Sequence, residues 1–411
     1  MNVFEQTRLA KQKSILLATA PTNVKNAMLL AIADSVEKCA EDILSANAID
    51  IEKGANMTPV MRDRLLLTPD RIKRMADGVR DLIDLPDPVG RVLSEHTQKD
   101  GLNIKRISVP IGVVGVIYEA RPNVTIDVAT LCIKSGNAVV LRGGRDAINT
   151  NRALAKVVKT AIADMADCVQ FIDDETREST GELLKADHDV DVIIPRGGEK
   201  LKEYILSNTK IPVICSAGGV CHTYVEKTAD LFKAKEIVKN AKLQRPSVCN
   251  ALETLLVDRE IADEFLPVVL GEMKELKSVV VHGDSQVKAI YPDTVEILSD
   301  DEYHTEYLDY AMSVKIVDGV EDAIRHINTY STKHSDAIIT EDRQKADKFI
   351  AGVDSADVYV NASTRFTDGY EFGLGAEVAI STQKLHARGP VGLNELNTYK
   401  NVIIGNGQIR K

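Results

Sequence analysis

The sequence predicts an α/β protein with a doubly wound, mostly parallel sheet, and three observations lead to that class. From residue 106 onward, short apolar runs alternate with helical patterns, which favours parallel strands joined by helices. Glycine-rich turns follow several of these runs, at the place where such sheets bind ligands. A chain of 411 residues, 44% hydrophobic and 27% charged, also has the size and composition of a globular protein with two or more domains.

The pattern of elements begins with amphipathic helices over the first 85 residues, which Pro86 and Pro88 end. Residues 90–103 are polar and contain the turn pair Asp100-Gly101, so we predict a projecting hairpin there. The alternating region then predicts strands over 111–118, 138–141, 168–172, 190–194 and 211–215, and helices over 124–134, 147–165 and 199–207. A second alternating region begins after residue 220.

Composition and charge exclude several classes of function. A net charge of -10 and a pI near 5.4 argue against a nucleic-acid or anionic-membrane surface. We expect a cytoplasmic protein, because the N-terminal residues do not resemble a secretory signal and no apolar run approaches the roughly 18 residues of a membrane span. The six cysteines are then reduced thiols, and since none forms a CxxC pair we expect no metal site.

Cys249 is the candidate covalent nucleophile. It lies in KLQRPSVCNALETLLV, between a helix predicted over 231–241 and a buried strand predicted over 251–257. Pro246 ends the helix, so the thiol falls at a tight junction held by rigid elements. Arg245 is close enough in sequence to favour a thiolate. A buried structural cysteine is the alternative.

Three glycine turns are candidate phosphate sites. They are Arg142-Gly143-Gly144-Arg145, Arg196-Gly197-Gly198 and Ala217-Gly218-Gly219, each placed at the predicted end of a strand. Glycine lets a backbone approach a phosphate closely, and a helix start offers free amide hydrogens. None matches GxGxxG, and each one alone has the composition of an ordinary turn.

Several motifs together resemble the aldehyde dehydrogenase superfamily over nearly the whole chain. They are VPIGVVGVIYEARPNVT, NAVVLRGG, RPSVCN, EYLDYAMSVKIV and FGLGAE with LHARGPVGL. Several of them are those of the branch that reduces γ-glutamyl phosphate to glutamate-5-semialdehyde in proline biosynthesis. The resemblance implies an NADP(H)-dependent enzyme that forms a thioester on Cys249 and releases phosphate.

The resemblance also assigns the groups around that thioester. Asn123, in ARPNVT, matches the asparagine that binds the oxyanion, although a helix N-cap is the alternative. Hydrolytic members carry a glutamate where this chain has Ser216, and a serine cannot act as that carboxylate base. We therefore expect a thioester that resists water.

The cofactor assignment depends on the first glycine turn. NAD-preferring relatives have a lysine and a glutamate where this chain has Arg142 and Arg145, and an arginine can pair with the 2′-phosphate of NADP(H). Solvated surface arginines are the alternative. The resemblance adds Pro195 and Gly197 in the turn under the cofactor phosphates, and Glu306 at the nicotinamide ribose. The glycine turns add Gly143, Gly144 and Gly198 to the expected cofactor contacts.

The anionic groups of a γ-glutamyl phosphate need cations, and Arg121, Arg245, Arg365 and Arg388 are the candidates. The resemblance implies an aldehyde dehydrogenase-like fold of three parts. These are an NADP-binding domain (1–89 and 106–219), an oligomerisation arm (90–105 and 400–411) and an α/β catalytic domain (220–399), whose end can pack back on the cofactor domain. We expect a homo-oligomer acting on a small molecule, with transient transfer from glutamate 5-kinase. Another acylating or oxidising dehydrogenase and a non-catalytic scaffold are the competing hypotheses.

Overall fold

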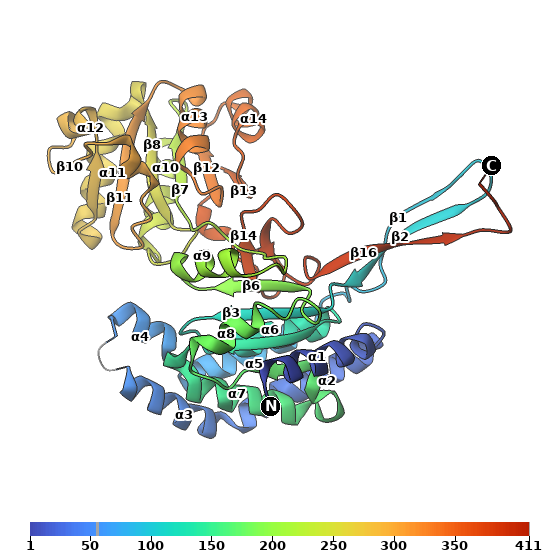
Figure 1. Ribbon diagram of the computed structural model, residues 1–411. Helices are drawn as coiled ribbons and strands as arrows, with labels where there is room; N and C mark the ends of the chain where they lie inside the picture. Colours follow the sequence, from blue (N-terminus) through green and yellow to red (C-terminus); the bar gives the residue numbers. More distant parts are fainter. Residues whose placement is uncertain (55–56, 411) are drawn as a thin grey trace. The chain divides into compact units, whose positions relative to one another are not determined.

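The chain forms two compact units. The structure, a computed structural model, describes residues 1–54 and 57–410, so residues 55 and 56 of the predicted NADP-binding domain and Lys411 of the predicted arm lie outside the described residues. Unit 1 comprises Met1–Cys215, Gly373–Ala379 and Val391–Lys411, and unit 2 comprises Ser216–Phe372 and Ile380–Pro390. Each unit contains its own parallel sheet, which confirms the predicted α/β class (Figure 1).

Unit 1 is built on a four-stranded parallel sheet in the order β5-β4-β3-β6. The two central strands are buried along their whole length, as the continuous apolar runs predict. Its strands are β3 (Val113–Tyr118), β4 (Ala138–Gly143), β5 (Val169–Phe171) and β6 (Val192–Arg196). Its helices are α1 (Val3–Leu17), α2 (Thr22–Lys38), α3 (Ala40–Lys53), α4 (Pro59–Leu65), α5 (Pro69–Asp84), α6 (Asn123–Lys134), α7 (Ile148–Ala161), α8 (Arg177–Leu183) and α9 (Glu199–Asn208).

The strand order of unit 1 fixes where a ligand binds. The chain passes from β3 to β4 and β5 in one direction, and β6 then returns to the other side of β3. Ligands of open α/β sheets bind outside the carboxyl ends of the strands where the order reverses. The segments that follow β3 and β6, which contain Asn123 and Gly197, therefore lie at this switch point.

Two predicted elements of unit 1 differ from the structure. The strand predicted over 211–215 is wrong, because only Val213 forms a bridge, to Ile193 of β6. Pro195, two residues further along the same edge of β6, has no amide hydrogen with which to continue the pairing. The helix predicted over 147–165 ends at Ala161 and is followed by a 3₁₀ turn, Ala163–Cys168.

A three-stranded antiparallel sheet extends from unit 1 (Figure 1). It contains β1 (Val92–Thr97), β2 (Asn103–Pro110) and β16 (Asn397–Ile404), so the hairpin predicted around Gly101 is confirmed and the C-terminal strand pairs with it. Gly101 has φ +85°, a left-handed conformation that suits glycine at this turn. We call this sheet the arm. Residues 391–399, predicted to end the catalytic domain, belong to unit 1.

Unit 2 has a seven-stranded parallel sheet in the order β10-β9-β11-β8-β7-β12-β13. Its strands are β7 (Cys221–Val225), β8 (Leu252–Asp258), β9 (Val280–Gly283), β10 (Val295–Glu296), β11 (Ala311–Val317), β12 (Ser335–Ile339) and β13 (Asp357–Val360). Its helices are α10 (Leu231–Leu243), α11 (Ala262–Lys277), α12 (Ser285–Ile290), α13 (Val320–Tyr330) and α14 (Arg343–Gly352). Two short strands, β14 (Ala379–Ser381) and β15 (Gly389–Val391), form a separate pair.

Both faces of the unit 2 sheet are covered. On β8, Leu255 and Val257 pack into an apolar cluster with α10 and α11, whereas Leu256 packs into a second cluster with α13 and α14. Successive strand residues point to opposite faces, so these two clusters lie on the two sides of the sheet. Among the described residues, no helix has the length and apolar character of a membrane span.

Candidate active site

Cys249 lies in a turn between α10 and β8, as predicted. The helix ends at Leu243 and the strand begins at Leu252, and the turn closes with a hydrogen bond from the Ala251 amide to the Val248 carbonyl (3.1 Å). The thiol residue is half-buried, whereas Cys221 beside it is fully buried. The site therefore forms at the amino ends of the unit 2 strands.

The loop before β7 packs directly against the backbone of Cys249. A Cβ atom placed on Gly219 would lie 1.7 Å from the Cys249 carbonyl oxygen and 2.6 Å from its Cα. The Cys221 thiol donates to the same carbonyl at 3.2 Å. The third predicted phosphate turn, 217–219, is therefore a packing element in unit 2, and its placement at the end of a strand is wrong because 211–215 is not a strand.

Ser216 and Glu306 both bond to this loop. The Ser216 hydroxyl accepts from the Gly218 amide (3.2 Å) and donates to the Gly218 carbonyl (3.1 Å). Glu306 accepts from the Gly219 amide at 2.8 Å, and its other carboxylate oxygen would lie 3.1 Å from a Cβ atom placed on Gly218. The polar groups of both side chains thus stabilise the backbone next to the thiol.

A second loop, residues 363–371, is anchored to the residue that follows the thiol. The Thr364 hydroxyl donates to the Asn250 carbonyl (2.7 Å), and the Asn250 amide group donates to the Thr367 carbonyl (2.7 Å). Thr367 in turn bonds to Ser335, the first residue of β12. Loop 363–371 is therefore held at the amino edge of the unit 2 sheet.

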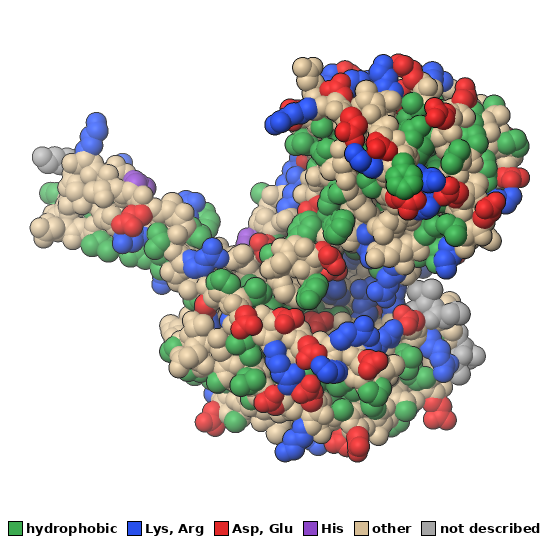
Figure 2. Space-filling view, turned by 180° about the vertical axis from the view of Figure 1, so that it is seen from behind, with side chains coloured by type: hydrophobic (Ala, Val, Ile, Leu, Met, Phe, Trp, Pro, Cys, Tyr) green, Lys and Arg blue, Asp and Glu red, His purple; other side chains and the backbone are tan. Residues whose placement is uncertain are grey.

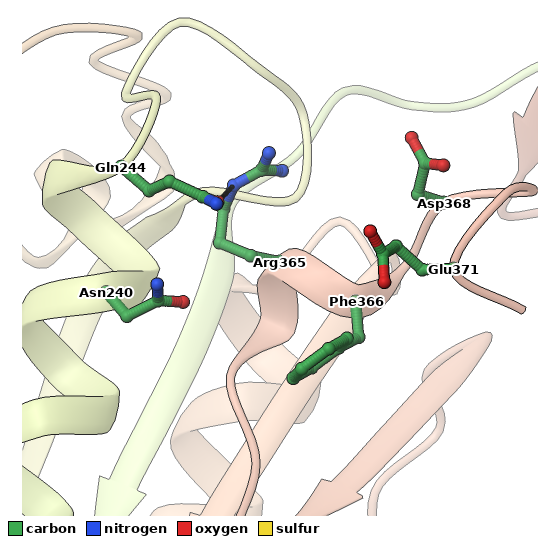
Figure 3. Close-up of a pocket in the computed structure, with 6 residues that line it drawn as sticks. All are labelled: Asn240, Gln244, Arg365, Phe366, Asp368 and Glu371. Carbon is green, nitrogen blue, oxygen red and sulfur yellow. Dashed lines mark hydrogen bonds between the residues drawn. The ribbon is translucent and has the colours of Figure 1, made fainter.

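Arg365 lies in this loop and lines a pocket of about 180 Å³ (Figure 3). Its Nε donates to Gln244 at 3.0 Å and its Nη1 donates to the Asn250 side chain. Burial lowers the pKa of the Arg365 guanidinium from its ordinary value, while the charges of Asp368 and Cys249 act in the opposite direction. The remaining lining residues are Asn240, Gln244, Phe366, Asp368 and Glu371.

The other predicted substrate arginines occupy different surroundings. Arg245 is exposed, and its charge is felt by Arg365, so these two cations and the thiol belong to one region of unit 2. Arg388 is instead paired with Asp354 at 3.0 Å, a carboxylate that also binds Lys333 and Lys384. Arg121 lies in unit 1, at the turn after β3.

Asn123 is the first residue of α6 in unit 1, and it does not act as the helix N-cap considered above. Its Nδ2 donates to Asp127, one helical turn later, at 2.8 Å. An ionised carboxylate only accepts, so this bond fixes which end of the carboxamide carries the hydrogens. Burial raises the pKa of Asp127 to about 6, against the lowering effect of the Asn123 bond.

The turn between β6 and α9 already binds a carboxylate. The Gly198 amide, at the N-cap of α9, donates to Glu119 at 3.0 Å. A Cβ atom on Gly197 would lie 2.6 Å from the Leu201 side chain and 2.7 Å from the same carboxylate, so glycine lets both side chains lie against this turn. This helix start therefore accepts an anion at the switch point of the unit 1 sheet.

Arg142 and Arg145 differ in accessibility. Arg142 is buried, and its two Nη groups donate to the carbonyls of Gly143 (2.9 Å) and Thr176 (2.7 Å). The Arg145 side chain is 79% exposed and lies 3.8 Å from Asp146. Of the two arginines, Arg145 is thus the one with its guanidinium on the surface.

Sequence reasoning missed several polar residues that hold the predicted ones. Asp127 carried a usable signal, because it follows Asn123 by four residues on a predicted helix. Glu119 and Asn250 carried none, since their partners Gly198 and Thr367 lie far along the chain. Asp368 lies only three residues after Arg365, the predicted residue on which its charge acts. Within the described residues there is no group of three or more His, Cys, Asp or Glu side chains suited to a metal ion.

Comparisons with known proteins give one consistent family. The family model described as "Aldehyde dehydrogenase family" matches residues 2–288 of this chain. Proteins named "Gamma-glutamyl phosphate reductase" from Syntrophomonas wolfei and Streptococcus suis are 50% and 52% identical, each covering 99% of this chain and 98% and 99% of their own lengths.

Solved structures show the same fold. A crystal structure of "Gamma-glutamyl phosphate reductase" from Thermotoga maritima has a TM-score of 0.96 and 42% identity, and each chain is covered completely. An acetylating aldehyde dehydrogenase from Geobacillus thermoglucosidasius has a TM-score of 0.71 at 17% identity, covering 100% of this chain and 97% of its own, a likeness of fold alone.

Proposed function

Because the chain belongs to the aldehyde dehydrogenase family, as its motifs predict, we propose that it reduces γ-glutamyl phosphate to glutamate-5-semialdehyde. The observation that carries this function is the full-length identity of 50% and 52% to proteins named for that reaction. The wider proposal includes NADPH as reductant, release of phosphate, a thioester on Cys249 and a cytoplasmic place in proline biosynthesis.

Cys249 acts as the nucleophile in this scheme. Its thiolate attacks the C5 carbonyl, a C–S bond forms, the bond to the phosphate oxygen breaks, and inorganic phosphate leaves. Reduction of the thioester gives a hemithioacetal, which collapses to the aldehyde and restores the thiol. The half-buried position of Cys249 and the backbone packing of Gly219 support a fixed, accessible thiol.

The oxyanion of each tetrahedral intermediate needs preorganised donors. We assign this role to the Cys249 amide and to Asn123. The Asn123 amide group carries two hydrogens, and Asp127 accepts one of them. The Ser216 hydroxyl bonds to the Gly218 backbone. Because serine has no carboxylate with which to activate water, this residue supports a thioester that survives until it is reduced.

NADPH, when bound, supplies the hydride for the reduction. Two features of unit 1 fit such a cofactor. The Gly198 amide donates to the Glu119 carboxylate, which supports a place for the cofactor pyrophosphate at the start of α9, with Gly197 beside it and Pro195 near the end of β6. The exposed Arg145 guanidinium suits a 2′-phosphate. Gly143, Gly144 and Glu306 complete the proposed set, whereas the Nη groups of Arg142 already serve backbone carbonyls.

The assay for the function runs the reaction in reverse. Purified enzyme should reduce NADP continuously with glutamate-5-semialdehyde only when phosphate is present to cleave the thioester. Cys249→Ala should lower that rate by about 10⁴-fold or more, because the covalent route is lost. Cys39→Ala, a half-buried thiol in unit 1, is the matched control and should retain full rate. Turnover without phosphate, or a fully active Cys249→Ala enzyme, would contradict the proposal.

Cofactor preference is tested separately. Arg145→Glu should weaken NADPH binding roughly 10- to 100-fold and leave NADH binding nearly unchanged, since a carboxylate repels the 2′-phosphate. Fluorescence titration with each nucleotide gives the two Kd values without turnover. Arg152→Glu, another partly exposed arginine of unit 1, is the control. Equal losses for both nucleotides in Arg145→Glu would count against a role in choosing NADP(H).

A further inference from the structure

The pocket of unit 2 combines one cation with two carboxylates. Arg365 lies between Gln244 and the carboxylates of Asp368 and Glu371 in the view of Figure 3. A pocket built only for the two anionic groups of a γ-glutamyl phosphate would have no use for these carboxylates, because like charges repel. The α-carbon end of that substrate, however, also carries an ammonium group.

Loop geometry connects this pocket to the reacting atoms. Asn250 follows Cys249 directly and binds both the Arg365 side chain and the Thr367 carbonyl. Thr364 closes the connection by donating to the Asn250 carbonyl at 2.7 Å. The charges of Asp368 and Cys249 both act on the pKa of Arg365, which is a second sign that the three residues lie close together. The pocket is thus part of the thiol's own surroundings.

We propose that this pocket recognises the amino-acid end of the substrate, with Asp368 and Glu371 binding the α-ammonium group and Arg365 the α-carboxylate. This inference rests on the proposed function, since it names which part of the γ-glutamyl substrate the pocket takes. The bonds to Gln244 and Asn250 account for two of the five N–H donors of Arg365 and fix its orientation. A guanidinium so held suits a carboxylate.

Holding the ammonium has a chemical consequence beyond specificity. In a γ-glutamyl thioester the neutral α-amine can attack C5 of its own chain. The N–C5 bond then forms, the C5–S bond breaks, the amine loses its proton to solvent, and a five-membered lactam leaves the Cys249 thiol. Intramolecular attack of this kind is fast. An ammonium paired with carboxylates keeps its proton and has no lone pair, so Asp368 and Glu371 protect the thioester from this loss.

Two aldehydes separate recognition from chemistry. Glutamate-5-semialdehyde carries the amino group, and 5-oxopentanoate has the same chain without it. With NADP and phosphate, the Asp368→Asn/Glu371→Gln variant should lose roughly 10- to 100-fold in kcat/KM for the first aldehyde. It should lose less than about 3-fold for the second, which also shows that the variant is folded. Glu264→Gln, an exposed carboxylate on α11, is the matched control and should change neither value.

Lactam release gives an independent readout. Without phosphate, the wild-type enzyme should form one NADPH per Cys249 from glutamate-5-semialdehyde and then stop. The double variant should continue slowly, and mass spectrometry should detect 5-oxoproline. Equal losses for both aldehydes, or unchanged values together with no lactam, would overturn the inference. If the wild type oxidises neither aldehyde with phosphate, the proposed function itself fails, an outcome distinct from loss of discrimination alone.

Discussion

At the scale of single residues, the orientation of the Asn123 carboxamide decides whether its amide hydrogens can serve the oxyanion in the proposed mechanism. Asn123 has a carbonyl oxygen and an amide group of nearly the same shape, and only the bond to Asp127 distinguishes them. A protonated Asp127 can donate as well as accept, which would allow the carboxamide to turn around. In the proposed mechanism, the charge state of Asp127 therefore controls how well Asn123 serves as an oxyanion donor.

This control predicts a pH dependence. Since burial raises the pKa of Asp127 to about 6, the wild-type kcat should fall as the pH drops through about 6 and should be full above it. Asp127→Asn should lower kcat about 10-fold at pH 8 and remove that acid limb, because no group titrates at this position. The measurement is kcat from pH 5 to 8 at saturating substrate. An unchanged acid limb in Asp127→Asn would contradict the role.

The effect of Asp127 on stability has a definite sign. Its folded pKa lies above the ordinary value of 3.8, so the folded state binds the proton more tightly than the unfolded state. The free energy of unfolding therefore decreases as the pH rises from about 4 to about 6, as far as this group contributes. Above pH 6 the enzyme keeps an ionised carboxylate at a cost in stability, which fits a role in positioning Asn123.

At the scale of elements, two loops and one turn converge on Cys249 within unit 2. The periodicity of α10 and the apolar run of β8 predict the junction correctly, because local patterns determine local elements. The same patterns do not reveal that loops 216–219 and 363–371 meet at Asn250 and Cys249. Such contacts depend on the order of strands in the sheet, which the periodicity of a single chain does not contain.

Glycine at position 219 is the strictest requirement of this arrangement. Gly219→Ala would place a methyl group within the Cys249 backbone, so we expect a loss of about 1–3 kcal/mol in the free energy of unfolding and a strong loss of activity. Gly271→Ala is the matched control, because nothing lies within 4 Å of its added Cβ on helix α11, and it should be neutral or stabilising by up to about 1 kcal/mol. Urea unfolding and the NADP assay measure both effects. Equal behaviour of the two variants would contradict the packing.

At the scale of the whole molecule, the sequence predicts the kinds of element better than their roles. The strand predicted over 211–215 fails because Pro195 cannot extend the ladder on the neighbouring strand. Arg142 and Arg145 look equivalent in the sequence, yet one is buried against backbone carbonyls and the other is exposed. Arg142 belongs to the buried strand β4, whereas Arg145 begins the 3₁₀ turn after it, and a short glycine-rich motif does not show where the strand ends.

The arm is the part of the molecule that most needs a partner. Every residue of β1 is exposed, and apolar side chains on the two outer strands, β1 and β16, face solvent, including Leu93 (52%), Tyr399 (51%) and Ile403 (55%). Figure 2 shows hydrophobic side chains in green along the arm. A three-stranded sheet with an exposed edge and no covered face has little stability of its own. We therefore expect the arm to pair with a second copy of the chain.

Ile403→Lys should abolish the expected oligomer, because an ammonium group replaces an apolar side chain near the C-terminal end of β16, opposite Ile104 of β2. Leu298→Lys is the control. Leu298 is 87% exposed on unit 2, outside the arm, so its replacement should leave the mass unchanged. Light scattering after size exclusion at micromolar concentration measures the mass of each variant. A monomeric wild type, or an Ile403→Lys enzyme of unchanged mass, would show that the arm does not hold the copies together.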